Sequence, residues 1–143
     1  MNIAIGADHA GYELKKTIMI FLTEKGHQVE DFGCYSTESI DYPDYAHPVC
    51  ESLEKGSNKL GVLICGSGNG ISMAANKHSG IRACLSWVPE IAELGRLHNN
   101  ANVLSIPARF INEEMALKIV EVFFNTEFEG GRHQRRVDKI ACI

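Results

Sequence analysis

The chain has 143 residues, of which 45% are hydrophobic and 22% are charged, and its formal net charge is −4. This composition fits one globular domain, and the lack of a basic excess argues against a nucleic-acid-binding protein. No apolar run approaches the roughly 20 residues that a membrane span needs, and residues 1–6 lack the features of a signal peptide, so we expect no membrane partner.

The five cysteines include no C-x-x-C pair. They are Cys34, Cys50, Cys65, Cys84 and Cys142. An odd count without paired spacing argues against a disulfide framework and against a zinc knuckle. We therefore expect a protein of the reducing cytoplasm.

Short runs rich in Ile and Val predict five buried strands, at residues 2–6, 27–32, 60–65, 81–85 and 101–106. The segments between and after them carry apolar residues at helical spacing. They predict helices from Tyr12 to before Gly26, from Pro43 to before Gly56, from the Gly-rich stretch to Lys77, and at 89–97, 113–124 and 132–140.

Strands that alternate with helices predict right-handed βαβ units and a parallel sheet covered on both faces. No linker, low-complexity tract or internal repeat divides the chain. We therefore expect a single doubly wound domain over residues 1–143. Its fold is predicted to be a Rossmann-like, three-layer α/β/α arrangement around a five-stranded parallel sheet.

Polar and Gly-rich residues gather next to three of the predicted strands. Asp8–Gly11 follows the first strand, Cys65–Gly70 begins at the end of the third, and His98–Asn100 precedes the fifth. Ligands of doubly wound sheets bind outside the strand ends, on the loops that lead into helices. We therefore expect these distant segments to assemble one site.

The Gly-rich turn after Cys65 is the most specific of these features. Gly66, Gly68 and Gly70 let consecutive backbone N–H groups face an anion or a developing oxyanion. A dinucleotide fingerprint needs Gly or Ala where Ile71 stands, and a cysteine-phosphatase loop needs Arg there. The Gly-Lys-Ser/Thr of a P-loop is missing as well. An anion cradle and a purely structural βα turn both remain open.

Three side chains near these turns suit proton transfer, and each also has a plainer interpretation. Cys65 beside the turn is expected to have a stabilised thiolate, yet cysteines at buried strand ends often only pack. Asp8 can hold a substrate hydroxyl or merely cap the next helix. His98 can exchange a proton near neutral pH, or it can be an idle loop histidine.

Arg132 and Arg136 are four residues apart and are predicted to share one face of the last helix. With His133 they form a candidate phosphate clamp, and the competing interpretation is a solvated basic helix end. His9, His98 and His133 lack the i,i+4 spacing or the cysteine partners of a metal site, so we predict no metal ligands.

Seven ordered segments of the chain resemble those of a known family. They are GADHAG (residues 6–11), DYPDYA (41–46), CGSGNGIS (65–72), AANK (74–77), GIRA (80–83), HNNANVL (98–104) and GGRHQRRV (130–137). Over essentially its full length the chain resembles the type B ribose-5-phosphate isomerases of the ribose/galactose isomerase family.

The resemblance implies metal-independent aldose–ketose isomerisation of ribose 5-phosphate and ribulose 5-phosphate without a cofactor. It implies that Cys65 moves the proton between C2 and C1, with Ser67 and the turn stabilising a cis-enediolate. His98 is implied to open the furanose ring with help from Asp8. The remaining substrate-binding positions that it implies are His9, Tyr42, Gly66, Gly68, Asn69, Gly70, Asn99, Arg109, Arg132 and Arg136.

The resemblance also implies a homodimer or a dimer of dimers with its active sites at the subunit interface. Two residues depart from the common pattern. Ser67 replaces a frequent Thr and keeps its hydroxyl, and Pro107 replaces a commoner Gly in the loop that presents Arg109. An isomerase of a six-carbon phosphate, such as allose 6-phosphate or galactose 6-phosphate, and a non-catalytic sugar-phosphate binder remain alternatives.

Overall fold

The computed structural model describes residues 1–142, so the last residue of the predicted domain lies outside the described residues. The five predicted strands are confirmed, as β1 (Asn2–Ala7), β2 (Gln28–Asp31), β3 (Leu60–Cys65), β4 (Ala83–Leu85) and β5 (Val103–Pro107). The helices are α1 (Tyr12–Glu24), α2 (Pro43–Glu54), α3 (Asn69–Ala75), α4 (Pro89–Asn99), α5 (Glu113–Asn125) and α6 (Arg132–Asp138), and a short 3-10 helix, η1 (His9–Gly11), precedes α1.

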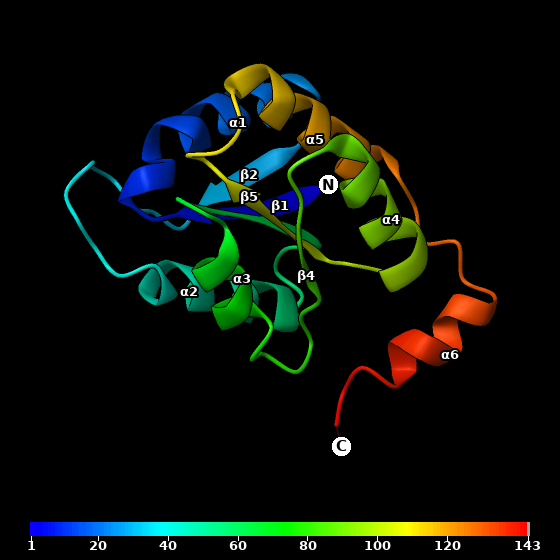
Figure 1. Ribbon diagram of the computed structural model, residues 1–143. Helices are drawn as coiled ribbons and strands as arrows, with labels where there is room; N and C mark the ends of the chain where they lie inside the picture. Colours follow the sequence, from blue (N-terminus) through cyan, green and yellow to red (C-terminus); the bar gives the residue numbers. More distant parts are fainter. Residues whose placement is uncertain (143) are drawn as a thin grey trace.

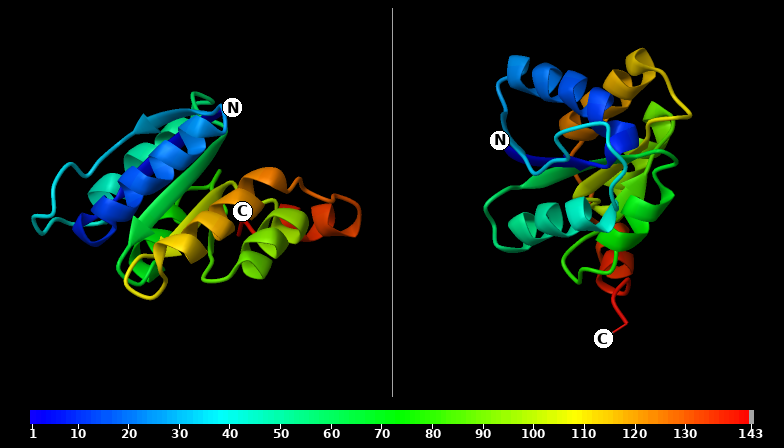
Figure 2. Two further views of the ribbon diagram at one scale, coloured as in Figure 1. Left: turned by 90° about the horizontal axis from the view of Figure 1, so that it is seen from above. Right: turned by 90° about the vertical axis from the view of Figure 1, so that its left-hand side faces the viewer.

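The strands form one sheet in the order β2-β1-β3-β5-β4, and every pair is parallel. Helices α1, α4 and α5 cover one face, and α2 and α3 cover the other (Figures 1 and 2). Each face has its own apolar core, in which helix residues such as Ile119 on one side and Val49 on the other pack against the strands. The predicted three-layer α/β/α fold is therefore confirmed.

The central strands create the crevice in which such folds hold ligands. β1 and β3 are neighbours, with Ala7 paired to Ile64. The chain leaves β1 toward β2 on one side and returns to β3 on the other, so the crossovers diverge at this point. Doubly wound sheets bind ligands at such a switch point, outside the carboxyl ends of the strands. The residues that follow β1 and β3 are therefore candidates for the site.

The last helix stands apart from the two covering layers. α6 contacts α4 and projects beyond it, away from α1 and α2 (Figure 1). It ends at Asp138, slightly earlier than predicted, and a pair of backbone bonds from Lys139 and Ile140 closes its last turn. Within residues 1–142, no helix has both the length and the apolar character that crossing a membrane requires.

Candidate active site

Asp8 follows β1 directly at the switch point. Its Oδ1 accepts hydrogen bonds from the backbone N–H groups of Ala10 (2.9 Å) and Gly11 (3.2 Å), so its capping role is confirmed. The Asp8 amide donates to the carbonyl of Ile64 (3.0 Å), which places this residue beside the end of β3. No hydrogen bond from residues 1–142 reaches Oδ2, which leaves that oxygen available to a ligand.

Cys65 ends β3, and its side chain is buried inside the Gly-rich turn. The backbone N–H of Gly68 donates to its Sγ at 3.2 Å. Gly68 has φ +77°, a left-handed conformation that glycine adopts without strain and that aims this amide at the sulfur. Cys65 Sγ therefore lies within the Gly-rich turn with a backbone donor directed at it, and Asp8 follows the neighbouring strand.

Ser67 lies exposed at the tip of the same turn. Its Oγ accepts a hydrogen bond from the amide of Asn69 at 3.2 Å, so the hydroxyl proton remains free to donate to a substrate oxygen. Asn69 begins α3. The turn therefore offers a hydroxyl donor on the solvent side of the buried sulfur.

Two further predicted side chains lie against the glycines of this turn. The Tyr42 ring covers Gly70, so closely that a Cβ added there would lie 2.8 Å from Tyr42 Cε1. The Arg109 guanidinium covers Gly66, whose added Cβ would lie 3.1 Å from Nη1. The glycines thus give these side chains room to approach the turn. Tyr42 and Arg109 therefore both lie against the turn that follows Cys65.

Pro107 does not carry Arg109 away from the turn. The amide of Ala108 donates to the Cys65 carbonyl (2.9 Å), and the amide of Arg109 donates to the Gly66 carbonyl (3.0 Å). These two bonds continue the pairing of β3 with β5 beyond Pro107, the last residue of β5. They hold the Arg109 backbone directly beside the Gly-rich turn.

His9 lies in η1, next to Asp8, and one of its ring nitrogens is engaged. The backbone N–H of Ile40 donates to His9 Nδ1 at 3.2 Å. An Nδ1 that accepts a hydrogen bond carries no proton, so in the neutral ring the proton sits on Nε2. His9 can therefore donate from Nε2 to an anion such as a phosphate.

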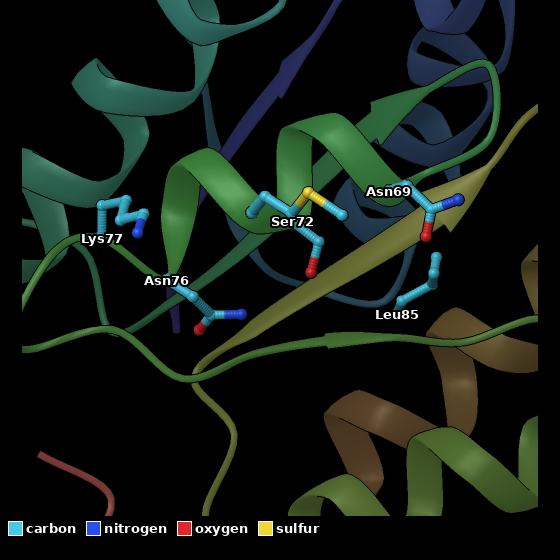
Figure 3. A pocket seen from close by; sticks show the side chains of 6 residues that line it. Asn69, Ser72, Asn76, Lys77 and Leu85 are labelled. Atoms are coloured by element: carbon cyan, nitrogen blue, oxygen red, sulfur yellow. The ribbon is translucent and has the colours of Figure 1, made fainter.

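A groove of about 430 Å³ adjoins the Gly-rich turn (Figure 3). Side chains of α3 and its C-terminal end line one side, and Leu85 of β4 lines the other. Of the predicted site residues, Asn69 lines this groove and Cys65 does not. The groove is therefore a neighbour of the turn and not the position of the sulfur.

His98 and Asn99 lie at the amino end of the neighbouring strand, so within one chain they do not meet the segments that follow β1 and β3. Both residues belong to the last turn of α4. That helix leads from the carboxyl end of β4 back to the amino end of β5, whereas Cys65 stands at the carboxyl end of β3. Strands of this length span roughly 17–20 Å. Within one chain, His98 and Cys65 therefore belong to separate clusters.

The second cluster joins the end of α4 to α6. The rings of His98 and His133 stack, with centroids 4.2 Å apart and an interplanar angle of 13°. Arg132 and Arg136 are exposed on the same helix as His133. Burial lowers the pKa of His133, and the neighbouring His98 lowers it further, whereas Glu129 acts in the opposite direction. Basic side chains therefore gather around a histidine pair, far from the Gly-rich turn of the same chain.

Glu129 was missed by the sequence reasoning. It precedes His133 by four residues, and its Oε2 lies 3.9 Å from His133 Nε2 and 4.0 Å from His98 Nε2. Spacing among the histidines alone predicted no metal ligands, but the structure brings one potential ligand atom from each of these three residues within 4.8 Å of the others. The i,i+4 spacing of Glu129 and His133 was the available signal.

Two arginines that the sequence reasoning also missed hold the end of α4. Arg82 Nε donates to the carbonyls of Asn99 (3.2 Å) and Asn100 (2.9 Å), and Arg96 Nε donates to the carbonyl of Thr126 (3.0 Å). Burial lowers the pKa of both arginines. Cations are favoured at helix C-termini, where carbonyl groups lack partners. These contacts fix the segment that presents His98 and Asn99.

The parallel sheet and the Gly-rich turn at its switch point define a Rossmann-like α/β protein. The chain belongs to a family described as Ribose/Galactose Isomerase, whose model matches residues 3–140. It is 46% identical over 142 residues to ribose-5-phosphate isomerase B of Escherichia coli strain K12, with 99% of this chain and 95% of that protein covered.

Solved structures agree with this membership. The ribose 5-phosphate isomerase of Thermotoga maritima is 50% identical and superposes with a TM-score of 0.97, covering 99% of this chain and 98% of that one. Ribose-5-phosphate isomerase B of Mycoplasma genitalium, solved with bound ribulose-5-phosphate, is 48% identical with a TM-score of 0.94, covering 97% and 93%.

Proposed function

We propose that the chain is an aldose–ketose isomerase that interconverts ribose 5-phosphate and ribulose 5-phosphate. The names of the similar isomerases support this substrate, as does the ribulose-5-phosphate bound to the Mycoplasma genitalium protein. The observation that carries the proposal is the Gly68 N–H donated to Cys65 Sγ, next to Asp8 at the switch point. This contact places Cys65, the proposed proton acceptor, in the same turn as the backbone N–H groups proposed to stabilise an oxyanion.

In the proposed reaction, the Cys65 thiolate removes the proton from C2 of the open-chain aldose. The C2–H electron pair becomes the C1–C2 double bond of a cis-enediolate, and the charge moves onto the C1 oxygen. The turn amides and the Ser67 hydroxyl stabilise this charge, as donors placed in advance do in enolisation. The Cys65 thiol then returns its proton to C1, and the proton of the C2 hydroxyl passes to the C1 oxygen, so that C2 becomes the ketone and C1 carries a neutral hydroxyl. Neither a metal nor a cofactor takes part.

His98 and Asp8 are assigned to ring opening, and Asn99 to a substrate oxygen. A phosphate bound by His9, Arg109, Arg132 and Arg136 anchors the end of the sugar that does not react. Binding energy from such a remote group orients the reacting carbons. Tyr42 and the backbone of Gly66, Gly68, Asn69 and Gly70 complete the sugar pocket.

These assignments require two copies of the chain, because the Cys65 and His98 clusters lie at opposite edges of one sheet. We infer a homodimer, or a dimer of dimers, in which His98 and α6 of one copy approach the Gly-rich turn of the other. A two-fold dimer forms two such sites by one contact, because its interface is self-complementary. The active sites then lie at the subunit interface.

A substrate panel tests the reaction. Purified protein is assayed with ribose 5-phosphate, ribulose 5-phosphate, allose 6-phosphate and galactose 6-phosphate, each with and without a chelator. We expect the highest kcat/KM for the five-carbon pair and no loss of rate with the chelator. Preference for a six-carbon phosphate would reassign the substrate, binding without turnover would indicate a sugar-phosphate binder, and a strict metal requirement would contradict the proton-transfer scheme.

A further inference from the structure

Three potential metal ligands converge where α4 meets the segment before α6. His98, Glu129 and His133 each bring one ligand atom to within 4.8 Å of the other two. The Nε2 atoms of the two histidines lie 4.0 Å and 3.9 Å from the same carboxylate oxygen, Oε2 of Glu129. Both imidazoles therefore direct the same nitrogen toward one acid.

His133 is the anchored member of this trio. It is 5% exposed, and its buried Nε2 has no hydrogen-bond partner within residues 1–142. Buried polar atoms in folded proteins are nearly always paired, so an unpaired ring nitrogen aimed at a carboxylate needs a partner. The amide of Glu129 donates to the Leu97 carbonyl (3.1 Å), which ties the acid to the end of α4. Backbone structure thus brings the three ligands together from separate segments.

We propose that His98, Glu129 and His133 form a binding site for Zn²⁺, through which zinc inhibits the enzyme. Two histidines and one carboxylate, with a fourth tetrahedral position left open, are a ligand set that zinc accepts. Imidazole nitrogens do not suit Mg²⁺ or Ca²⁺, which prefer oxygen ligands. The inhibition rests on the proposed function, because zinc bound to Nε2 of His98 withdraws a ring nitrogen of the residue that is assigned to proton exchange during ring opening.

The trio has the freedom that coordination requires. Tetrahedral zinc at about 2.0–2.2 Å from each ligand needs ligand atoms about 3.3 Å apart, which is closer than they now lie. The side chains of His98 and Glu129 are 40% and 57% exposed and can turn, whereas His133 stays fixed. Zinc binding rotates the His98 ring out of its stack with His133. Arg132 and Arg136 oppose a cation, but water screens these exposed charges, so we expect micromolar affinity.

Metal binding is tested on the full chain with Cys142→Ser, which removes the exposed thiol beyond α6. Zn²⁺ affinity is measured by calorimetry, and Co²⁺ reports the ligand type through its visible absorption. Glu129→Gln removes a ligand, whereas Glu127→Gln is the matched control, because Glu127 is exposed two residues away and outside the trio. We expect Glu129→Gln to weaken Zn²⁺ binding at least about tenfold, the control to bind like the parent, and Mg²⁺ not to bind.

Inhibition is measured as the initial isomerisation rate at increasing Zn²⁺, divided by the metal-free rate of the same variant. We expect the parent and Glu127→Gln to lose activity at the concentrations at which they bind zinc, and Glu129→Gln to need at least about ten times more. Equal zinc binding by Glu129→Gln, or a Co²⁺ spectrum dominated by thiolate charge transfer, overturns the site. Binding without inhibition overturns the inhibitory role. A chain without isomerase activity overturns the proposed function and leaves the binding result to decide the site.

Discussion

The sulfur atoms of this chain differ in their surroundings, and those differences separate a candidate base from packing residues. Cys65 Sγ accepts a hydrogen bond from the backbone N–H of Gly68, whereas Cys50, a residue of α2, is buried in the apolar core between that helix and the sheet. Burial, with Glu54 as a further cause, raises the pKa of Cys50 to about 12. Burial also raises the pKa of Cys84. Cys84 Sγ receives a hydroxyl donor from Ser86 (3.8 Å), whereas the donor at Cys65 is a backbone N–H of the Gly-rich turn.

Replacing Cys65 should remove turnover while leaving substrate binding largely intact. Cys65→Ala deletes the base but keeps the turn amides and the phosphate ligands, so kcat should fall by about 10²- to 10⁴-fold with little change in KM. Arg136→Ala deletes a proposed phosphate contact that would be the same in ground and transition states, so it should mainly raise KM. Steady-state kinetics with ribose 5-phosphate separate the two effects. Near-normal kcat in Cys65→Ala would reject the assigned base.

Thiol alkylation tests the different surroundings of the cysteines without a measurement of turnover. With a pKa of about 12, Cys50 stays a protonated thiol between about pH 7 and 9, and the thiol reacts far more slowly than the thiolate. We expect iodoacetamide to label exposed Cys142 first and to spare Cys50 until the protein is unfolded. Peptide mass spectrometry over time measures the order. Labelling of Cys50 at the rate of Cys142 in folded protein would contradict its burial.

At the scale of elements, a buried lysine holds the loop between β2 and α2. Lys15 of α1 is 1% exposed, and its Nζ donates to Asp31 Oδ1 (2.6 Å) and to the Cys34 carbonyl (2.7 Å). The same Asp31 oxygen accepts the amide of Gly33 (2.8 Å). This loop continues to Ile40, which bonds His9, and leads directly into Tyr42. The lysine therefore fixes a segment on which two proposed substrate contacts depend.

Lys15→Met should destabilise the fold, and its neighbour offers a matched control. The variant leaves the Asp31 carboxylate without its cation. Because the Asp31 side chain is 27% exposed, water can solvate the carboxylate and offset part of the lost interaction. We expect the free energy of unfolding to fall by about 2 kcal/mol. Exposed Lys16 pairs with Glu13 at the surface, so Lys16→Met should leave the free energy of unfolding essentially unchanged. Urea denaturation measures both, and equal losses would contradict the buried clamp.

The helices and strands were predictable because the periodicity of their apolar residues is strong. The residues at which they begin and end were not predictable in the same way. Residues 81 and 82 were predicted as strand, but β4 begins at Ala83. The side-chain oxygens of Asn102 and Asn76 accept the amides of Arg82 and Ala83 (2.8 Å each), so side chains take hydrogen bonds that a longer strand would give to its neighbour. Such hydrogen bonds join residues that are distant in the sequence, so the local pattern of apolar residues cannot predict them.

The candidate site was predictable where a single turn builds it. Cys65, Ser67 and the glycines are local to one βα connection, and the sequence indicated both the connection and its donors. Lys15 was missed because a charged residue is assigned to the surface, although Ile18 and Leu22 follow it at the spacing of a buried helical face. The separation of His98 from Cys65 within one chain was not predicted, because proximity to a strand was considered without the direction of the helix that carries His98.

For the whole molecule, the separation of Cys65 from His98 within one chain predicts how two copies of the chain associate. The sheet sets the sulfur at the carboxyl end of β3 and the histidine before the amino end of β5. The last helix does not bridge this distance within one chain, because α6 packs on α4 and projects away from the Gly-rich turn (Figure 1). If both residues serve one reaction, they come from different copies, and that condition can be tested without a structure of the assembly.

Mixed dimers of two defective variants should regain activity. When Cys65→Ala and His98→Ala chains are refolded together in equal amounts, half of the dimers are mixed. Each mixed dimer pairs the intact Cys65 of one copy with the intact His98 of the other at one of its two sites, so about one quarter of the wild-type rate should return. As the control, wild type mixed with the double variant should keep about one quarter if sites are shared and about one half if each chain has its own. No recovery in the first mixture, together with one half in the control, would place Cys65 and His98 of the same chain in one site and contradict the shared interface.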